Sequence, residues 1–267
     1  MSKPRKSASA SAAPIRMPRL EKRALHAQIV DEIGRRIVSG ALQPGKPLTS
    51  ESGLCAEMGV SRTVLREAFR VLSDKGLIEA RPKAGTLVTH PERWNFLDRD
   101  VMAWKLDSGV TADFIVDLYE LRHLIEPVAA ALAAGRATPD DLSRLQTAYV
   151  DMEAAGDDGQ ALLEPDLRFH RSVIDATGNP LVASLGHLIE AALEANFQLS
   201  VGTPRGQRQS MPLHKAVLDA IAEGDANAAR IAMRQLIEDS KRDLPHAKIK
   251  ATPPVPRIAK KRPGQKS

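Results

Sequence analysis

The sequence has 267 residues, enough for one large domain or two of ordinary size. Charged residues make up 27% and hydrophobic residues 43%, a balance typical of a chain with a packed core and unlike that of a disordered or fibrous protein. The single Cys55 excludes an intrachain disulfide and a cysteine-rich zinc finger, and an aromatic content of 3% disfavours a protein that stacks single-stranded bases.

The charge is unevenly distributed along the chain. Residues 1–20 hold five basic residues and residues 245–267 hold seven, and neither stretch contains an acidic residue. Between these ends, residues 21–90 carry a net charge of +3 and residues 91–244 one of −10. A basic N-terminal module is therefore joined to an acidic C-terminal one.

The two ends, 1–19 and 244–267, are expected to be basic tails. Their Ser, Ala, Pro and Lys content is typical of solvated disorder, although positive arms also attract nucleic-acid phosphates with an affinity that falls with salt. No apolar run approaches the roughly 20 residues that span a bilayer. No apolar signal segment follows Lys3, Arg5 and Lys6. We therefore expect a cytoplasmic protein without a membrane partner.

The N-terminal module, residues 20–90, is predicted to begin with three helices. Four apolar residues recur every four positions along the first helix: Leu25, Ile29, Ile33 and Ile37. This helix should end at Gly40, since glycine suits a helix C-cap. Ser50 and Gly59 are expected to cap the two ends of a short second helix, and Ser61 the start of the third.

The third helix is predicted to have two different faces. Its inward face is apolar and consists of Leu65, Ala68, Phe69 and Leu72. The opposite face consists of Arg62, Thr63, Arg66 and Arg70. One α-helix fits the major groove of B-form DNA, where arginine can bind guanine with two hydrogen bonds. An ordinary amphipathic helix whose arginines are only solvated has the same pattern, so this helix alone leaves both readings open.

A hairpin is predicted after the third helix. Short strands at 77–80 and 86–89 flank the tip 81–85, which is basic. Three helices followed by a basic-tipped hairpin form the pattern of a winged helix-turn-helix, and this pattern favours DNA binding over a merely solvated face. Cys55 is interpreted as a small core residue rather than a redox centre.

The same stretch resembles the GntR family of bacterial transcription factors. The resemblance rests on Leu48-Thr49-Ser50-Glu51, on the run from Gly59 to Ala68, on Gly76-Leu77-Ile78 and on Ala84-Gly85-Thr86. It implies that the recognition helix contacts DNA through Ser61, Arg62, Thr63 and Arg66. It also implies a wing tip that enters the minor groove, made of Arg81, Pro82, Lys83 and Gly85. Many members have an arginine directly after the Ser-Glu pair, whereas this chain has Ser52, so its operator should differ from the commoner ones.

Residues 111–243 are predicted to form an all-helical bundle, preceded by a linker with a short helix over 91–110. Capping signals and apolar spacing place the helices of the bundle at 111–134, from Pro139 onward, at 159–176, from Leu181 to about 202, at 208–223 and at 226–242. With the short segment 95–107, seven helices are expected. The protein as a whole is therefore expected to be mainly α.

Two residues on one of these helices have the spacing of a metal site. Asp166 and His170 lie four residues apart and hence on one helical face, where a carboxylate and an imidazole can share an ion. His214, on a later helix, could add a ligand from across the bundle. Surface pairs without a metal have the same spacing, so the pattern leaves both readings open.

The bundle resembles the FCD effector domain of the FadR subfamily. The motifs are Asp166 to His170, Gly178-Asn179-Pro180, His214 with Leu218 to Ile221, and Gly224-Asp225 followed by Ala232-Met233. Many FCD domains hold a divalent transition metal, zinc being the expected one, with one Asp and three His. The resemblance implies that Asp166, His170 and His214 are ligands here. The third histidine falls on Leu236, which cannot ligate, so a water or an effector carboxylate would complete the site.

Effector-binding residues are assigned within the same resemblance. It implies that Arg122 points into a cavity and binds an anion with its planar fork of donors. Asn179 is assigned to the effector site as well. An ion pair between Arg122 and Glu126, four residues later, is the alternative for the arginine. His187 is interpreted as a surface histidine rather than a substitute metal ligand.

Together these patterns predict a homodimeric, ligand-controlled transcription regulator, and not an enzyme. The winged helix would bind the palindromic operator of a catabolic operon, and a small carboxylate bound in the helical domain would relieve repression. The segment from Trp94 to Trp104 resembles members that respond to sugar acids, so a sugar acid is the expected effector. The alternative is a metal-free regulator that binds the acid directly and acts as an activator or dual regulator.

Two rival classes have less support. A metal-dependent hydrolase needs a general base, and no partner carboxylate or His-Glu motif accompanies the three candidate ligands. An architectural DNA-binding protein driven by the basic tails would bind random duplex as well as one palindrome. The basic tails give this second rival its only support.

Overall fold

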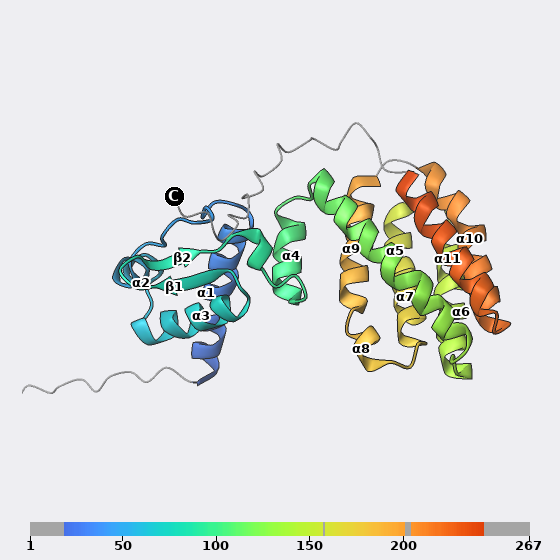
Figure 1. The fold of residues 1–267 in the computed structure, drawn as a ribbon, viewed down its shortest axis with the longest axis horizontal. Coiled ribbons are helices and arrows are strands. Elements are labelled where there is room, and N and C mark those ends of the chain that lie inside the picture. The colour runs from blue at the N-terminus through green and yellow to red at the C-terminus, as the bar shows by residue number, and fades with distance from the viewer. Residues whose placement is uncertain (1–18, 157, 201–203, 243–267) are drawn as a thin grey trace, which may run out of the picture. The chain divides into compact units, whose positions relative to one another are not determined.

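The computed structural model describes residues 19–156, 158–200 and 204–242, and the chain divides after Asn95 into two compact units. Unit 1 ends at Asn95 and unit 2 begins at Phe96. Helices dominate both, and one two-stranded hairpin is the only sheet in the described part of the chain (Figure 1). The mainly α fold class is therefore confirmed. None of the helices found there is long and apolar enough to cross a membrane.

Unit 1 contains the predicted three helices and hairpin. Its elements in chain order are α1 (Arg19–Val38), α2 (Glu51–Met58), α3 (Arg62–Asp74), β1 (Ile78–Arg81) and β2 (Gly85–Val88). Helix α1 packs against α3, and the buried hydrophobic residues of these two helices form the core: Ile29, Val30, Ile33, Ile37 and Val38 from α1, and Leu65, Ala68 and Leu72 from α3. The apolar spacing therefore predicted most of the packed faces, but Leu25 and Phe69, which it also placed inward, are only partly buried.

Local capping chemistry sets the ends of α2 and α3. The side chain of Ser50 accepts a hydrogen bond from the backbone of Gly53, and that of Ser61 accepts one from Val64. Gly59 ends α2 with a φ of 66°, in the left-handed region that glycine tolerates best. All three caps were predicted from the sequence.

The hairpin is shifted by one residue from the predicted strands. It pairs Ile78 with Val88 and Arg81 with Gly85, so three residues form the turn. One of them, Lys83, has a φ of 66°, which is uncommon for a residue with a side chain. The tip is therefore tighter than the five-residue one predicted.

The linker predicted over 91–110 does not form a separate element. The short 3₁₀ helix η1 (Pro91–Arg93) belongs to unit 1, where the backbone of Asn95 donates to the carbonyl oxygen of Lys75 at 3.0 Å. Helix α4 (Arg99–Asp107) belongs to unit 2 and packs against helix α9 (Gly186–Ser200). The boundary between the units is thus a short stretch of chain around Asn95.

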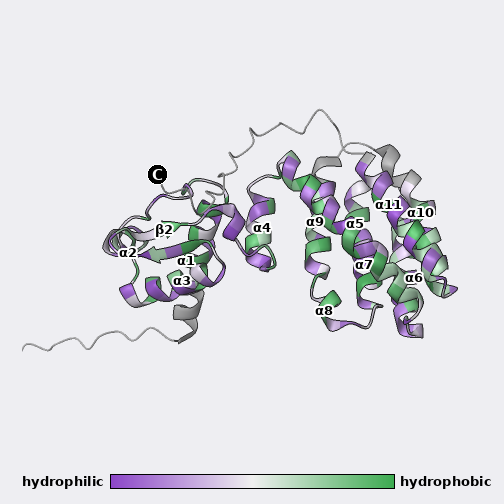
Figure 2. Cartoon of the chain, in the orientation of Figure 1, coloured by the Kyte–Doolittle hydropathy of each residue, from purple (hydrophilic) through white to green (hydrophobic). Residues whose placement is uncertain are grey.

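Unit 2 is a bundle whose longest helix, α5, lies among several others. After α4 it contains α5 (Ala112–Ala134), α6 (Pro139–Ala155), α7 (Gly159–Asp175), α8 (Pro180–Ala183), α9 (Gly186–Ser200), α10 (Pro204–Ala222) and α11 (Ala226–Arg242). Helix α5 packs against α7, α9, α10 and α11, and α7 also packs against α6 and α9. Hydrophobic and hydrophilic residues alternate along these helices in Figure 2, as in amphipathic helices that surround a core.

The helix predicted to run from Leu181 to about 202 is interrupted, so the described part of unit 2 has eight helices rather than seven. Asn179 caps the single turn of α8, and the chain then restarts as α9 at Gly186. A Cβ at Gly186 would lie 2.8 Å from Nη1 of Arg171. The guanidinium of Arg171 forms ion pairs with both Asp175 of α7 and Glu190 of α9. This close approach between α7 and α9 is a tertiary contact, and the apolar spacing alone could not reveal it.

Candidate functional site

The outward face of α3 carries the residues predicted to read DNA. Arg62, Thr63, Arg66 and Arg70 are exposed, whereas Leu65 on the opposite face is fully buried. Ser61 is exposed too, and its hydroxyl caps the helix. The recognition face is therefore accessible within unit 1, and its rigidity comes from the buried side of the same helix.

Three of the basic residues on α3 and the wing are already paired with carboxylates. Arg70 Nη1 lies 3.9 Å from Glu67 Oε2 on the same helix. Arg66 Nε lies 3.0 Å from Oε2 of Glu51 in α2, and Arg81 Nη2 lies 2.5 Å from Glu79 Oε1. Glu79 also accepts from Arg93, and this hydrogen bond, followed by that of Arg81, holds its pKa below the ordinary value. Exposed pairs of this kind are weak, so DNA phosphates and bases can replace the carboxylates at little cost.

The wing tip is exposed along its whole length. Arg81, Pro82, Lys83 and Gly85 all face solvent, as a groove-binding tip requires. Ser52, which stands where many relatives have arginine, is also exposed, and its hydroxyl lies 3.2 Å from that of Ser50. The contacts of all these residues with DNA remain predictions.

Asp166, His170 and His214 come together in unit 2. The first two lie one turn apart on α7, and His214 reaches them from α10; the ligand atoms of the three lie within 4.8 Å of one another. Asp166 Oδ1 lies 3.8 Å from His170 Nε2 and 3.1 Å from His214 Nε2. Ligand atoms about 2.1 Å from a tetrahedral zinc ion are roughly 3.4 Å apart, so these separations suit a single ion.

Both histidines direct Nε2 toward Asp166 and use Nδ1 elsewhere. His170 Nδ1 lies 2.5 Å from Glu126 Oε2, and His214 Nδ1 lies 2.9 Å from the carbonyl oxygen of Ser210. An ionised carboxylate and a carbonyl only accept, so each Nδ1 carries the hydrogen. Metal-ligating histidines typically donate through their second nitrogen in this way. The residues present therefore fit a divalent transition metal, held by two Nε2 atoms and one carboxylate.

The electrostatics of the cluster favour ionised carboxylates. Burial by itself would raise the pKa of Asp166, but its contacts with His214 and His170 and the nearby guanidinium of Arg122 lower it to about 2. Burial also opposes the ionisation of Glu126, yet Arg122 and His170 lower its pKa to about 2. Two negative charges therefore lie next to the two imidazoles at neutral pH.

Arg122 is almost fully buried, at 1% exposure, and its positive charge acts on Asp166. Its Nε donates to Glu126 Oε1 at 2.6 Å, so the ion pair considered as the alternative is present. Its Nη1 is buried without a hydrogen-bond partner in the described residues. A buried donor left unpaired costs about 1–3 kcal/mol. Arg122 therefore forms the ion pair and keeps one donor for an anion, and its effector contact remains a prediction.

The other residues singled out in unit 2 have local roles. Asn179 Oδ1 accepts from the backbone of Leu181 at 3.0 Å, which caps α8, and its assignment to the effector remains a prediction. His187 contacts the carbonyl oxygens of Ser184 and Leu97, both at 2.9 Å, as a structural histidine would. Leu236 is 2% exposed and lies in the hydrophobic core.

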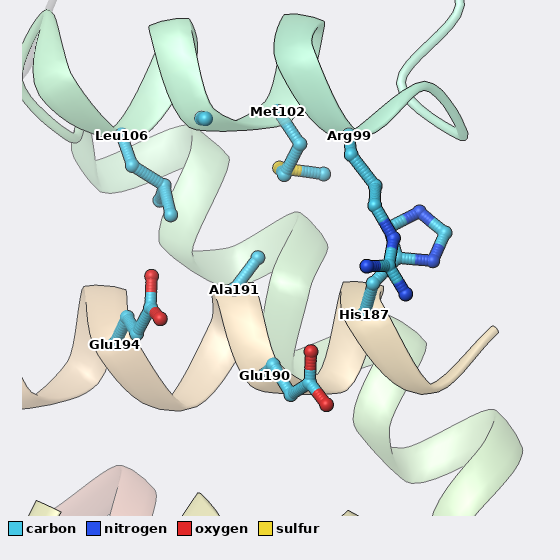
Figure 3. A pocket seen from close by; sticks show the side chains of 8 residues that line it. Arg99, Met102, Leu106, His187, Glu190, Ala191 and Glu194 are labelled. Carbon is cyan, nitrogen blue, oxygen red and sulfur yellow. The ribbon is translucent and has the colours of Figure 1, made fainter. Parts of the chain in front are cut away.

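A cavity of about 150 Å³ lies between α4 and α9, apart from the Asp166 cluster. Figure 3 shows Arg99 beside His187 at one end, with Glu190 and Glu194 farther along α9. Burial, together with the charges of Glu190 and Asp107, raises the pKa of Glu194. None of the predicted site residues lines this groove.

A polar group beside Arg122 was not foreseen from the sequence. The hydroxyl of Tyr119 on α5 donates to Asn196 Oδ1 at 3.0 Å and lies 3.1 Å from Ser240 Oγ, while Asn196 Nδ2 donates to Ser240 at 3.1 Å. The guanidinium of Arg122 lies 5.7 Å from the centroid of the Tyr119 ring. The three helices that supply this group are far apart in sequence, and no local pattern marks it.

Comparison with known families assigns both units. Residues 25–88 match the family described as "Bacterial regulatory proteins, gntR family", and residues 117–239 match the FCD domain. The first match covers the helices and hairpin of unit 1. The second covers most of the bundle, including Arg122 and the three candidate metal ligands.

Individual relatives match over most of the chain. A protein of Escherichia coli K12 called the galactonate operon transcriptional repressor is 37% identical over 218 residues, which cover 81% of this chain and 95% of the relative. The putative L-lactate dehydrogenase operon regulatory protein of the same organism is 30% identical over 217 residues, which cover 79% of this chain and 83% of the relative. The solved structure of Lar shares the fold with a TM-score of 0.56 and 22% sequence identity. The match covers 82% of this chain and 97% of Lar, which is described as controlling the expression of the agr system of Listeria monocytogenes.

Proposed function

Because the chain belongs to the GntR family of bacterial regulatory proteins and carries an FCD domain, we propose that it represses an operon for the use of a sugar acid. A homodimer binds a palindromic operator through α3 and the wing, and it releases the operator when the acid occupies unit 2. Two relatives are named for galactonate and L-lactate, which are both 2-hydroxycarboxylates. This chemical class is therefore the one we propose for the effector.

The exposed face of α3 supports the DNA-binding part of the proposal. Its arginines project into solvent from a helix whose other face is buried, so the helix can enter a major groove without losing its packing. Arg62 and Arg66 are the residues we assign to base contacts. The wing, with Arg81 and Lys83 exposed at its tip, would follow the backbone into the adjacent minor groove.

An apolar surface on unit 2 supports a homodimer. Leu124 and Val128, one turn apart on α5, are 73% and 53% exposed, and Ile231 on the neighbouring helix α11 is 50% exposed. Large apolar side chains in solvent on neighbouring helices can mark an interaction surface. A two-fold pair of subunits would bury this surface against itself and present two recognition helices to the halves of a palindrome.

The observation that carries the effector assignment is the buried donor of Arg122, whose charge acts on one of three candidate metal ligands. Arg122 Nη1 has no partner in the described residues, and the Nε2 atoms of His170 and His214 face one carboxylate. A bound divalent transition metal, zinc by our expectation, would supply open coordination positions for ligand oxygens. The carboxylate of a 2-hydroxy acid would meet Arg122, and Asp166 and the two histidines would hold the ion.

The acid controls DNA binding only through unequal affinity for two arrangements of the dimer. If the acid binds more tightly to the arrangement that cannot span the operator, occupancy of unit 2 releases DNA. Operator binding then lowers the affinity of the protein for the acid by the same factor. This preference of the acid for the DNA-incompetent arrangement would relieve repression when the acid binds. The opposite preference would make operator binding depend on the acid, as a ligand-dependent activator requires.

Calorimetry on the intact protein tests the effector assignment. D-Galactonate and L-lactate are titrated into the parent, with added Zn²⁺ and separately with EDTA. We expect galactonate to bind the parent in the presence of Zn²⁺. Arg122→Gln should lower the affinity for galactonate at least tenfold. Arg168→Gln, which changes an exposed arginine of α7, is the matched control and should leave the affinity unchanged.

Three results of that titration are informative. Binding that persists undiminished in EDTA would favour the metal-free form of the regulator, in which Arg122 and the neighbouring polar side chains bind the acid directly. Equal affinity of Arg122→Gln and the parent would remove Arg122 from the effector site. Absence of binding by either acid, with and without Zn²⁺, would contradict the proposed effector class.

A further inference from the structure

One carboxylate of unit 2 holds both the arginine and a histidine of the candidate site. Glu126 Oε1 accepts from Arg122 Nε at 2.6 Å, and Glu126 Oε2 lies 2.5 Å from His170 Nδ1. All three side chains are at most 2% exposed. We propose that Glu126 is a positioning residue of the metal centre, which fixes the ring of His170 so that Nε2 is free to bind the ion. This inference rests on the proposed function.

The geometry at His170 assigns the two ring nitrogens. Glu126 is paired with a guanidinium, so it is an acceptor and the hydrogen of His170 lies on Nδ1. Nε2 then carries the lone pair on the side of Asp166, whose Oδ1 is 3.8 Å away. A ring released from Glu126 could rotate or place its hydrogen on Nε2, and either change would remove a ligand from the cluster.

The two histidines are held differently, which makes Glu126 specific to one of them. His214 Nδ1 contacts the carbonyl oxygen of Ser210, one turn earlier on its own helix α10. His170 instead depends on a side chain from a different helix, 44 residues earlier in the chain. The orientation of His170 therefore follows the packing of α5 against α7, whereas that of His214 is set within α10.

Arg122 acts on the same histidine through Glu126. Its guanidinium is the cation that balances the buried carboxylate, and the pair is formed within one turn of α5. Because α5 also packs against α7, the arginine, the glutamate and the histidine form one chain of contacts from α5 to the metal ligand. The partner carboxylate of a ligating histidine typically affects metal affinity by about 10–100-fold when removed.

The experiment measures Zn²⁺ affinity by competition with a chromogenic chelator, on the full chain. We expect Glu126→Gln to bind Zn²⁺ about 10–100-fold more weakly than the parent. The visible absorption bands of bound Co²⁺ should also change, which a purely structural role of Glu126 would not produce. Glu164→Gln is the matched control, because it removes an exposed carboxylate from the helix that carries Asp166 and His170, and its affinity should equal that of the parent.

Two further measurements keep the test decisive if Glu126→Gln folds poorly. The double variant Arg122→Met/Glu126→Gln leaves no unpaired buried charge, and it should show the same loss of Zn²⁺ affinity. In the Zn²⁺-loaded parent, nitrogen-15 NMR should show His170 bound to the ion through Nε2 with a hydrogen on Nδ1. An ion on Nδ1 would overturn the inference.

The outcomes separate this inference from the proposed function. A parent that binds neither Zn²⁺ nor Co²⁺ would refute the metal centre and, with it, the role of Glu126. A parent that binds Zn²⁺ while both Glu126 variants stay within twofold of it would overturn the inference alone. The metal centre of the proposed function would stand in that case.

Discussion

The two candidate sites of this protein differ in how they are built. The recognition face of α3 consists of exposed side chains on a helix that is packed through its other side, and its ion pairs are made at the surface. The site in unit 2 consists of buried side chains that hold one another, with Arg122, Glu126 and His170 at most 2% exposed. Function and stability are therefore separable in unit 1 and coupled in unit 2.

The largest effect is expected from breaking the buried ion pair. Glu126→Gln leaves Arg122 without its counter-ion, and removing one partner of a buried pair costs about 3–5 kcal/mol. Urea unfolding followed by circular dichroism measures this free energy, with Glu164→Gln as the exposed control. Equal stability of Glu126→Gln and the parent at neutral pH would show that the buried pair contributes nothing.

The same variant has an expected pH dependence. The pKa of Glu126 is lowered from 4.5 to about 2, so its ionised form stabilises the folded state. This contribution is fully present above about pH 4.5 and is lost as the pH falls toward 2. The difference in unfolding free energy between parent and Glu126→Gln should therefore shrink over that interval. A difference that stays constant there would contradict the lowered pKa.

The exposed site should show the opposite behaviour. Arg62→Ala and Arg66→Ala should each weaken operator binding by about 1–3 kcal/mol, the cost of a lost base contact, and leave the unfolding free energy within about 0.5 kcal/mol of the parent. Fluorescence anisotropy with an operator selected from a randomised library measures the first quantity. If both variants bind like the parent, α3 is not the recognition helix.

Ser61 lies between these extremes because it caps α3 and also faces the proposed DNA. Ser61→Ala should lower the unfolding free energy by about 1 kcal/mol, since the hydroxyl that accepts from Val64 is lost. Ser61→Asp retains a cap and should recover the stability, while its added negative charge should weaken operator binding. Full operator affinity in Ser61→Asp would exclude a phosphate close to this residue.

The smallest effect concerns the basic tails, which lie outside the described residues. Deleting 1–18 and 246–267 should flatten the salt dependence of nonspecific DNA binding, because phosphate contacts carry affinity but no sequence information. The preference for the operator over random duplex should persist. A preference that vanished with the tails would favour the architectural class of DNA-binding protein.

Local signals explain what the sequence could predict. The caps Ser50 and Ser61 each act within their own helix end, and the structure confirms both. The break between α8 and α9, beside which Gly186 approaches Arg171 of α7, was missed.

The candidate site in unit 2 shows the same limit. The spacing of Asp166 and His170 marked one helical face, and the family resemblance added His214. The contact of Glu126 with His170 joins residues 44 positions apart and has no local signature. A carboxylate four residues after an arginine predicted only the ion pair, which is half of what Glu126 does.

We propose that an acid bound in the buried site of unit 2 controls the exposed site of unit 1. The direct measurement is the anisotropy of a labelled operator duplex bound to the intact parent, as D-galactonate is added in the presence of Zn²⁺. We expect the operator affinity of the parent to fall as the galactonate concentration rises, and we expect Arg122→Gln to retain ligand-free operator affinity but lose this response. Galactonate that binds the parent by calorimetry yet leaves its operator affinity unchanged would contradict this proposal.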